Sequence, residues 1–313
     1  MKPDVLAIGS FPDATRTELA DRFNLHAYRR LALARDGLTP EVAARVRAIA
    51  TEANNGADRA LIEKLPKLEI ISVFGVGLDA IDLAAARERR LAVTNTPGIL
   101  ADEVGDLAIG LMLASARQIA SADRFVREGH WEKGPISFGR SVGGKTMGVV
   151  GLGGIGRAIA DRGAAFRMRI LYSGPRAKPG VPYTHVADVV DMARQSDFLM
   201  VACKGGPETR HLISADVLDA LGPKGTLVNV ARGSVVDEAA LIKALAEGRL
   251  GHAALDVFED EPHVPAALLA LPNVIVQPHH GSATVETRSA MGQLMIDNIS
   301  ARFEQRPLLT PVT

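Results

Sequence analysis

The stretch VVGLGGIG at 149–156 ends an apolar run at 146–151 and opens a helical pattern that continues to about residue 166. Its glycines have separate uses: Gly151 allows a tight turn, Gly153 lets the main chain approach a pyrophosphate, and Gly156 lets the helix pack closely on the strand. The start of the helix would offer unpaired N–H groups to the phosphates. An ordinary glycine turn is the alternative, but the flanking strand and helix favour a dinucleotide site. Its predicted residues are Gly151, Leu152, Gly153, Gly154, Ile155 and Gly156.

Short aliphatic runs alternate with helical patterns on both sides of this stretch, as expected for parallel strands joined by crossover helices. The runs before it lie at 5–9, 46–50, 68–75 and 91–95, with helices expected near 13–24 and 82–89. The run at 146–151 and those at 169–173, 197–202, 226–231, 253–258 and 273–278 give six further strands, followed by a helix at 285–303. The pattern predicts two α/β domains with doubly wound parallel sheets.

A long helix is expected between the two series, at about 101–127. Its apolar positions recur at helical spacing but extend further round than the single stripe of a surface helix. They are Val104, Leu107, Ala108, Leu111, Met112, Ile119 and Phe125. We therefore expect this helix to bridge domains or to form the interface of a homodimer.

The composition limits the kinds of partner and compartment. The 313 residues include 36 Lys and Arg and 36 Asp and Glu, so the zero formal net charge does not indicate a nucleic-acid or anionic-membrane binder. The only cysteine, Cys203, excludes an internal disulfide framework and a metal site built from cysteine. The apolar runs at 5–9 and 107–116 are too short for a secretory signal and a membrane helix, respectively. We predict a cytoplasmic protein without a metal.

The end of the strand after the glycine-rich turn predicts which coenzyme binds. Enzymes that prefer NAD usually carry Asp or Glu about 20 residues beyond the glycines, where it holds the ribose 2′-hydroxyl. Here Gly174 stands in that region, with Ser173 and Arg176 beside it. A hydroxyl and a guanidinium can both donate to a 2′-phosphate, which a carboxylate would repel. The sequence therefore predicts NADP, with NAD accepted at lower preference, unless Pro175 turns Arg176 into solvent.

Three polar stretches follow the late strands: NVARG at 229–233, DVFEDEP at 256–262 and QPHHG at 277–281. In this order, and together with the glycine-rich turn, they resemble the D-2-hydroxyacid dehydrogenase family. The resemblance extends through FGVGLDAIDL at 74–83 and NTPGILADEVGDLAIGLML at 95–113, and it includes almost everything after about residue 68. It is strongest to the glyoxylate/hydroxypyruvate reductase branch.

The strand pattern and the resemblance imply a Rossmann cofactor domain at 99–284 and a flavodoxin-like substrate domain formed by 1–98 and 285–313. The resemblance implies NADPH-dependent reduction of small 2-keto acids, such as glyoxylate or hydroxypyruvate, to D-2-hydroxy acids. Two alternatives are an NAD-linked dehydrogenase that acts oxidatively and a dinucleotide-sensing binding protein. The preferred keto acid and the physiological direction stay open.

Within the resemblance, the catalytic residues correspond to Arg232, Glu261 and His279. Arg232 would hold the substrate carboxylate in a bidentate fork and polarise the carbonyl, while protonated His279 would donate a proton as the hydride arrives. Glu261 would favour the protonated ring. Each of the three, taken alone, could be a solvated or structural residue. His280 departs from the family, which usually has an aliphatic residue there, so the choice between the two rings stays open.

The resemblance also implies a substrate loop whose backbone N–H groups receive the carboxylate. Its residues are Val73, Phe74, Gly75, Val76 and Gly77. Because Val73 offers a phosphate no cation, an unphosphorylated substrate is expected. Asp256 is expected among the residues that contact the cofactor. Trp131 stands in a segment from which relatives reach into a neighbouring subunit, although an interface or core aromatic is an equal alternative.

Overall fold

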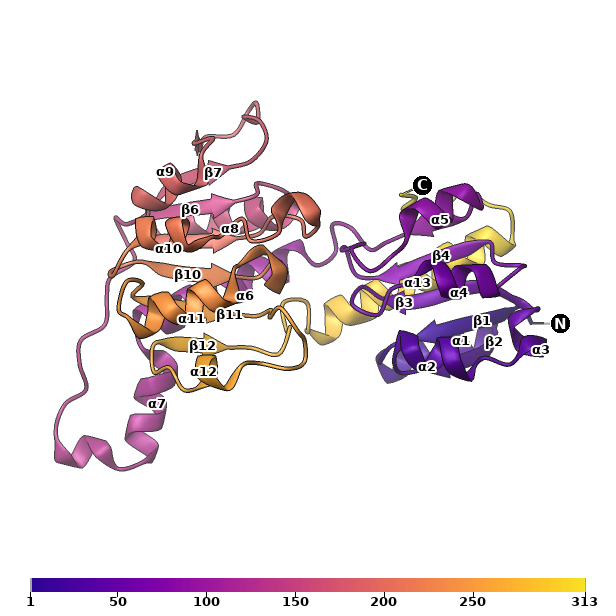
Figure 1. The fold of residues 1–313 in the computed structure, drawn as a ribbon, viewed down its shortest axis with the longest axis horizontal. Helices are drawn as coiled ribbons and strands as arrows, with labels where there is room; N and C mark the ends of the chain where they lie inside the picture. The colour runs from indigo at the N-terminus through magenta and orange to yellow at the C-terminus, as the bar shows by residue number, and fades with distance from the viewer. Residues whose placement is uncertain (1, 313) are drawn as a thin grey trace. The chain divides into compact units, whose positions relative to one another are not determined.

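A computed structural model describes residues 2–312, and the chain divides into two compact units (Figure 1). Unit 1 comprises Met1–Leu100 and Ser282–Thr313, and unit 2 comprises Ala101–Gly281. The boundaries expected from the sequence, after residues 98 and 284, lie within three residues of the points where the chain passes from one unit to the other.

Unit 1 contains a five-stranded parallel sheet in the order β2-β1-β3-β4-β5. Its strands are β1 (Asp4–Ile8), β2 (Asn24–Tyr28), β3 (Val46–Glu52), β4 (Ile70–Phe74) and β5 (Ala92–Thr94). This order, 2-1-3-4-5, is that of flavodoxin-like folds, so the expected fold of this unit is confirmed.

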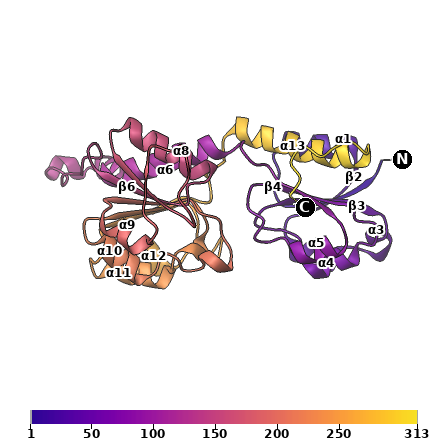
Figure 2. The same ribbon diagram turned by 90° about the horizontal axis from the view of Figure 1, so that it is seen from above.

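Helices cover both faces of the unit 1 sheet, with α1 and α13 on one face and α4 and α5 on the other (Figure 2). The helices are α1 (Asp13–Arg22), α2 (Leu31–Gly37), α3 (Pro40–Ala43), α4 (Arg59–Lys64), α5 (Leu83–Glu88) and α13 (Val285–Phe303). Because α13 packs on β4, the end of the chain returns to the first unit, as the sequence predicts. The sequence pattern misses β2, since this edge strand has no buried residue and therefore no apolar alternation.

Unit 2 contains a seven-stranded parallel sheet in the order β12-β11-β10-β9-β6-β7-β8. Its strands are β6 (Thr146–Val150), β7 (Arg169–Ser173), β8 (Thr184–His185), β9 (Phe198–Val201), β10 (Thr226–Asn229), β11 (His252–Leu255) and β12 (Val274–Val276). Counted from β6 and read from β8, the order is 3-2-1-4-5-6-7, which extends the Rossmann order by one strand. The expected Rossmann fold is confirmed, and the strand that the sequence pattern misses is β8, which has only two residues.

Helices also cover both faces of the unit 2 sheet, with α6 and α8 on one face and α9 to α12 on the other (Figure 2). The α-helices are α6 (Ala101–Ala116), α7 (Ile119–Arg127), α8 (Gly154–Ala165), α9 (Val189–Arg194), α10 (Ala215–Leu221), α11 (Glu238–Ala246) and α12 (Ala266–Leu269). Three short 3-10 helices are η1 (His130–Lys133), η2 (Pro207–Thr209) and η3 (Gly233–Val235).

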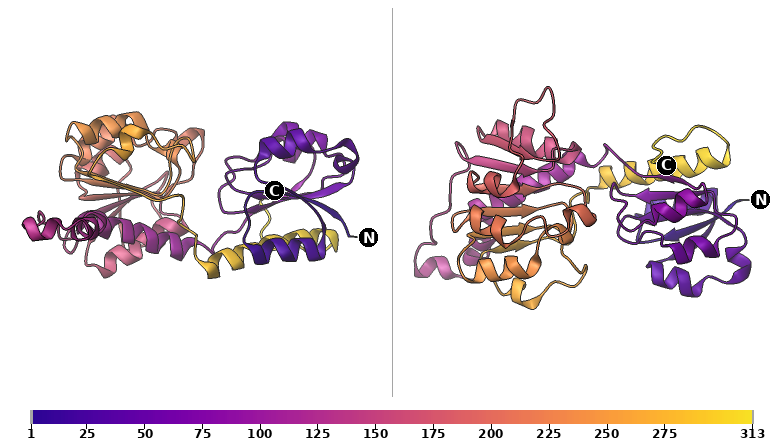
Figure 3. Two further views of the ribbon diagram at one scale, coloured as in Figure 1. Left: turned by 90° about the horizontal axis from the view of Figure 1, so that it is seen from below. Right: turned by 45° about the horizontal axis from the view of Figure 1, so that its top comes forward.

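The long helix expected at 101–127 is interrupted, so that prediction was wrong at residues 117–118. Helix α6 ends at Ala116, and Gln118 takes a left-handed conformation with φ 56° before α7 begins. The side-chain amide of Gln118 donates to the hydroxyl of Ser137 at 3.3 Å. Helix α7 consequently extends away from the sheet of its own unit (Figures 1 and 3). The apolar spacing could not reveal the break because it continues across it.

In residues 2–312 no helix is long and apolar enough to cross a membrane. Across the same range, no group of three or more His, Cys, Asp or Glu side chains is arranged to hold a metal ion. The thiol of Cys203 is free, and burial raises its pKa to about 11.

Candidate active site

The glycine-rich turn after β6 has the shape that a pyrophosphate requires. Gly151 has φ 89°, and a Cβ there would lie 2.5 Å from the Cα of Cys203. A Cβ at Gly156 would lie 2.0 Å from the carbonyl oxygen of Gly151, so only glycine lets α8 pack this closely on the turn. Gly153 differs, because a Cβ there would meet nothing within 4 Å. The turn is therefore packed tightly on the rest of the protein at Gly151 and Gly156, and it leaves free space beside Gly153.

The N-terminus of α8 supplies hydrogen-bond donors to this open side. Gly153 is the N-cap residue of α8, and no side chain caps the helix. The first-turn N–H groups therefore have no partner within the helix or from a cap, and the helix dipole favours an anion at this end. These donors and the open space beside Gly153 fit the pyrophosphate of a dinucleotide.

The end of β7 carries the residues that are expected to select the coenzyme. Ser173 is 3% exposed, and its hydroxyl donates to the carbonyl oxygen of Ala187 at 3.2 Å; its contact with a 2′-phosphate stays a prediction. A Cβ at Gly174 would meet nothing within 4 Å. Arg176 is exposed and makes no ion pair or hydrogen bond with residues 2–312. Of the two donors predicted for the 2′-phosphate, Arg176 is the one that is exposed and has no partner in the described chain.

The structure brings His279 and Glu261 together, with 2.7 Å between Nδ1 and Oε2. His279 follows β12, Glu261 lies in the loop after β11, and both side chains are partly exposed. Burial alone would raise the pKa of Glu261, but the hydrogen bond and charge of His279, the N–H of Phe258 and the charge of Arg232 outweigh it and lower the pKa. Because an ionised carboxylate only accepts, Nδ1 of His279 is the donor in this bond.

Arg232 lies in the loop after β10. Two residues that the sequence pattern does not single out hold this loop in shape. The side chain of Asn229, 1% exposed, donates to the carbonyl oxygen of Arg232 and accepts from the N–H two residues after itself, both at 3.0 Å. A Cβ at Gly233 would lie 1.9 Å from the carbonyl carbon of Phe258. The Arg-Gly sequence therefore lets the Arg232 loop pack directly on the loop that carries Glu261.

Asp256 holds the backbone around His279 from its buried position after β11. Its Oδ1 accepts from the N–H of His280 at 2.6 Å, its Oδ2 accepts from the N–H of Gly281 at 2.8 Å, and its carbonyl oxygen accepts from the N–H of His279 at 2.8 Å. Burial raises the pKa of Asp256, although these amides and the charge of His279 oppose it. Both carboxylate oxygens of Asp256 are engaged and the residue is 2% exposed, so Asp256 positions the histidine loop, and its expected contact with the coenzyme stays a prediction.

The two neighbouring histidines differ in backbone conformation and in side-chain partners. His279 has a left-handed backbone with φ 55° and is paired with Glu261. The imidazole of His280 is exposed and has no bonded partner in the described chain. The geometry therefore favours His279 as the ring that a carboxylate orients.

In unit 1, the predicted substrate loop begins at the end of a strand. Val73 and Phe74 are the last residues of β4 and are 0% and 2% exposed, so their side chains belong to the core, and their predicted contact with the substrate stays a prediction about their backbone. The buried Val73 also cannot decide whether the substrate carries a phosphate. Arg288 of α13, which the sequence pattern does not single out, places its guanidinium 5.4 Å from the centre of the Phe74 ring.

The remaining loop residues differ in the availability of their N–H groups. The N–H of Gly75 donates to the hydroxyl of Thr96 at 3.1 Å, so it is already used. The N–H groups of Val76 and Gly77 have no acceptor among residues 2–312. These two amides are the donors that the loop can offer to an anion.

Comparison with known proteins shows the family of the chain. The family model described as "D-isomer specific 2-hydroxyacid dehydrogenase, NAD binding domain" matches residues 109–281. The chain belongs to this family. It is 50% identical over 295 residues to hydroxyphenylpyruvate reductase of Plectranthus scutellarioides, with 94% of each chain covered. It is 52% identical over 267 residues to glyoxylate/hydroxypyruvate reductase A of Arabidopsis thaliana, with 85% of each chain covered.

A solved structure of the same family extends the likeness to the whole chain. The NADPH-dependent glyoxylate/hydroxypyruvate reductase of Sinorhizobium meliloti, in complex with NADP and malonate, has a TM-score of 0.94 and 41% identity. The alignment covers 100% of this chain and 97% of that chain. The family resemblance predicted from the sequence is therefore confirmed, and the protein is an oxidoreductase of the 2-hydroxyacid dehydrogenase family.

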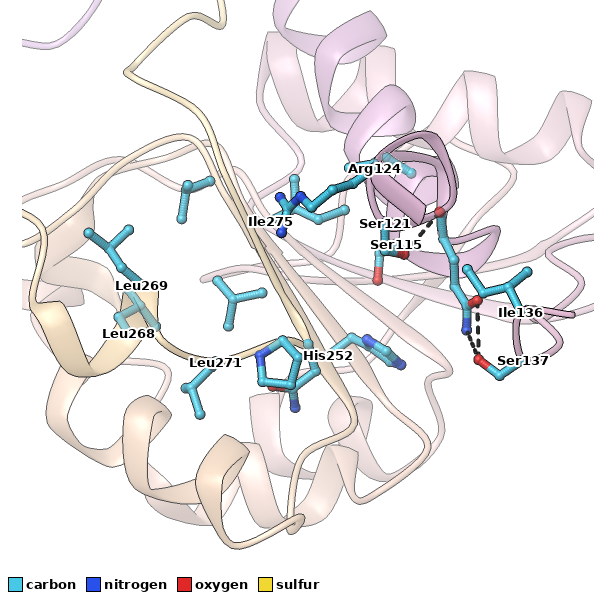
Figure 4. Close-up of a pocket in the computed structure, with 17 residues that line it drawn as sticks. Ser115, Ser121, Arg124, Ile136, Ser137, His252, Leu268, Leu269, Leu271 and Ile275 are labelled. Atoms are coloured by element: carbon cyan, nitrogen blue, oxygen red, sulfur yellow. Dashed lines mark hydrogen bonds between the residues drawn. The ribbon is translucent and has the colours of Figure 1, made fainter. Parts of the chain in front are cut away.

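Unit 2 of this 2-hydroxyacid dehydrogenase also contains a pocket of about 380 Å³ along the edge strand β12 (Figure 4). Its lining includes Ser115, Arg124, His252 and Leu269, and none of the predicted catalytic or coenzyme-binding residues. Burial, and then the charge of Arg140, lowers the pKa of His252. The pocket is therefore separate from the catalytic residues at the carboxyl ends of β10 to β12.

Proposed function

We propose that this 2-hydroxyacid dehydrogenase reduces small, unphosphorylated 2-keto acids to D-2-hydroxy acids with NADPH. The observation that carries the proposal is the 2.7 Å contact between His279 and an ionised Glu261, in the same unit as the glycine-rich turn. The relatives support it, because glyoxylate, hydroxypyruvate and hydroxyphenylpyruvate are all unphosphorylated 2-keto acids. Gly174 and Arg176 after β7 support NADPH over NADH.

The catalytic residues have complementary roles in this proposal. When bound, NADPH supplies a hydride to the carbonyl carbon. Arg232 binds the substrate carboxylate and polarises the carbonyl oxygen. Protonated His279 donates from Nε2 to that oxygen, so one hydride and one proton convert the ketone to a hydroxyl. Glu261 stabilises the imidazolium and orients the ring through Nδ1.

The backbone N–H groups of Val76 and Gly77 are the proposed further donors to the substrate carboxylate. They are the loop amides without an acceptor in the described chain, and glycine lets a ligand approach the backbone closely. The 50% identity to hydroxyphenylpyruvate reductase makes that bulkier keto acid a second candidate substrate.

The test is a steady-state assay of the purified protein with glyoxylate, hydroxypyruvate and hydroxyphenylpyruvate, each with NADPH and with NADH. We expect reduction of glyoxylate and hydroxypyruvate, with NADPH preferred. Faster reduction of hydroxyphenylpyruvate would select the second candidate. Turnover confined to oxidation with NAD, or dinucleotide binding without any turnover, would contradict the proposal in favour of the oxidative dehydrogenase or the sensing protein.

We also propose a homodimer formed through α7 and the segment that follows it. Ile119 and Val126 on α7 are 55% and 53% exposed, and Trp131 and Phe138 beyond it are 68% and 99% exposed. Large apolar side chains concentrated on one exposed segment are typical of a protein interface. The exposure of Trp131 argues against its core alternative. Light scattering should give a dimer that Phe138→Asp weakens, and a monomeric wild type would contradict this part of the proposal.

A cytoplasmic location is the last part of the proposal. It rests on the single, unpaired thiol of Cys203, which needs no oxidising compartment. Fractionation of the source cells is the test, and recovery from an extracytoplasmic compartment would contradict it.

A further inference from the structure

The loop between β7 and β8 is fixed at two points on either side of Arg176. The carbonyl oxygen of Gly174 accepts a hydrogen bond from Nε2 of His185 at 3.1 Å. The N–H of Lys178 donates to the hydroxyl oxygen of Tyr172 at 2.7 Å. Arg176 lies midway along the sequence between these two points, so the backbone that carries its guanidinium is held although the side chain is exposed.

The side chains that hold the loop are themselves well anchored. Tyr172 is 2% exposed in β7, and its ring centre lies 5.0 Å from that of His185, its partner across the β7–β8 pair. At the far end of the loop, the hydroxyl of Tyr183 donates to Asp161 of α8, the helix that begins at the glycine-rich turn. The loop is therefore tied both to the sheet and to the coenzyme-binding helix.

The two cations on this loop have no ion-pair partner in the part of the chain that the structure describes. Arg176 and Lys178 are both exposed, and neither makes an ion pair with another residue in 2–312. Two like charges on one short, fixed loop repel each other, and an anion bound between them would remove that repulsion. A Rossmann fold places the adenosine ribose at the end of its second strand, which is β7 in this chain. The anion expected at that position is a 2′-phosphate.

We propose that Lys178 is a second phosphate-binding cation beside Arg176, and that Tyr172 is the positioning residue that shapes the loop for both. The inference rests on the proposed preference for NADPH and extends it from one arginine to a pre-shaped site with two cations. Tyr172 acts through the backbone of Lys178 and does not touch the coenzyme. Because the loop is ordered before binding, less conformational entropy is lost when the phosphate binds.

The test measures binding of adenosine 2′,5′-bisphosphate and of 5′-AMP by calorimetry, so it needs no turnover. Lys178→Ala should weaken binding of the bisphosphate about tenfold or more, as expected for the loss of a charged hydrogen bond, and leave the affinity for 5′-AMP unchanged. Tyr172→Phe removes one hydroxyl and should weaken the bisphosphate about 3- to 10-fold, with the same change in the KM for NADPH and none in kcat or in the KM for NADH. The matched control is Lys243→Ala, which replaces an exposed lysine on α11 and should change the affinity for neither ligand.

The outcomes separate this inference from the proposed function. If the wild type binds both ligands equally well, the NADPH preference fails and the two-cation site fails with it. If the wild type prefers the bisphosphate but Lys178→Ala keeps the full preference, the second cation is overturned alone. Equal weakening of both ligands by Tyr172→Phe would mean a general loss of structure and would overturn its positioning role.

Discussion

Charged side chains are paired at one part of the unit 2 sheet, the paired end, and unpaired within the described chain at another, the unpaired end. At the carboxyl ends of β11 and β12, charges are paired within the protein: Glu261 with His279 at 2.7 Å, and Asp256 with two backbone N–H groups. At the carboxyl end of β7, the backbone is fixed but Arg176 and Lys178 have no partner in the described chain. Proton transfer needs groups held at set distances and in set protonation states, whereas recognition of an anion needs charges that only the ligand neutralises.

The largest effect is expected at the paired end. His279→Ala removes the proton donor and should lower kcat for keto-acid reduction by about 10²- to 10⁴-fold. NADPH binding, followed by fluorescence, should stay nearly unchanged because the dinucleotide turn is untouched. His280→Ala is the control and should have a smaller effect, since its ring is exposed and unpaired. If His280→Ala is the more damaging change, the proton donor is the other ring.

Arg232→Ala should reduce kcat/KM for the keto acid by about 100-fold, because the substrate carboxylate loses a bidentate, charge-assisted partner. Arg232→Lys should remain poor, since an ammonium cannot reproduce the fork. The thermal unfolding midpoint should change little, which separates the loss from misfolding. Normal reduction by the alanine variant would remove Arg232 from the catalytic group.

Gly174→Asp tests the unpaired end. A carboxylate there repels a 2′-phosphate and accepts from a 2′-hydroxyl, so the NADPH-to-NADH preference should fall by about tenfold or more. The variant should fold, because a Cβ at this position meets nothing within 4 Å. Arg176→Ala should weaken the binding of NADPH and leave that of NADH unchanged. Equal loss of both coenzymes in either variant would contradict a 2′-phosphate site at this loop.

The glycine-rich turn offers a matched pair of substitutions. Gly153→Ala should fold normally but weaken both coenzymes about fivefold or more, because its methyl group takes the space left for the pyrophosphate. Gly151→Ala should instead destabilise the protein by about 1–3 kcal/mol, since φ is 89° and the methyl group would meet Cys203. Titration with NADPH and chemical denaturation measure the two effects. Unchanged coenzyme binding in Gly153→Ala would place the pyrophosphate elsewhere.

The smallest effect is a shift in the pH profile of Glu261→Gln. The pKa of Glu261 lies below its ordinary value, so the carboxylate is ionised across the neutral and alkaline range and the alkaline limb reports loss of the donor's proton. Without that negative charge the imidazolium is less stable, and the alkaline limb of the reduction rate should move down by about one pH unit. A limb that stays in place would mean that Glu261 and the proton donor are not coupled.

The sequence was sufficient for most of the parallel strands and for the glycine-rich turn because these depend on local patterns. A glycine at a positive φ and an apolar strand keep their meaning wherever the chain folds, as Gly151 and β6 illustrate. The break before Gln118 could not be predicted, because the apolar spacing continues across it, and the Ser137 that Gln118 contacts lies nineteen residues further along. The hydrogen bond of Ser173 could not be predicted either, since its acceptor, Ala187, lies on the far side of a loop.

Within the site, the residue types that do chemistry could be predicted and the residues that position them could not. His279 and Glu261 carry recognisable chemistry in their motifs. Asn229, Asp256 and Tyr172 act through hydrogen bonds to backbone atoms, and those of Asp256 reach a segment that only the folded sheet brings near, whereas that of Tyr172 depends on the course of the loop after its strand. Their roles therefore depend on the register of strands and loops, which the sequence pattern does not specify.

The proposal that this enzyme is an NADPH-dependent reductase is tested most directly by the product it forms. Purified protein should be incubated with hydroxypyruvate and NADPH, and the glycerate separated into its enantiomers by chiral chromatography. We predict D-glycerate in an amount equal to the NADPH consumed, with a slower reaction when NADH replaces NADPH. L-glycerate, NADPH consumption without glycerate, or an equal rate with NADH would contradict the proposal.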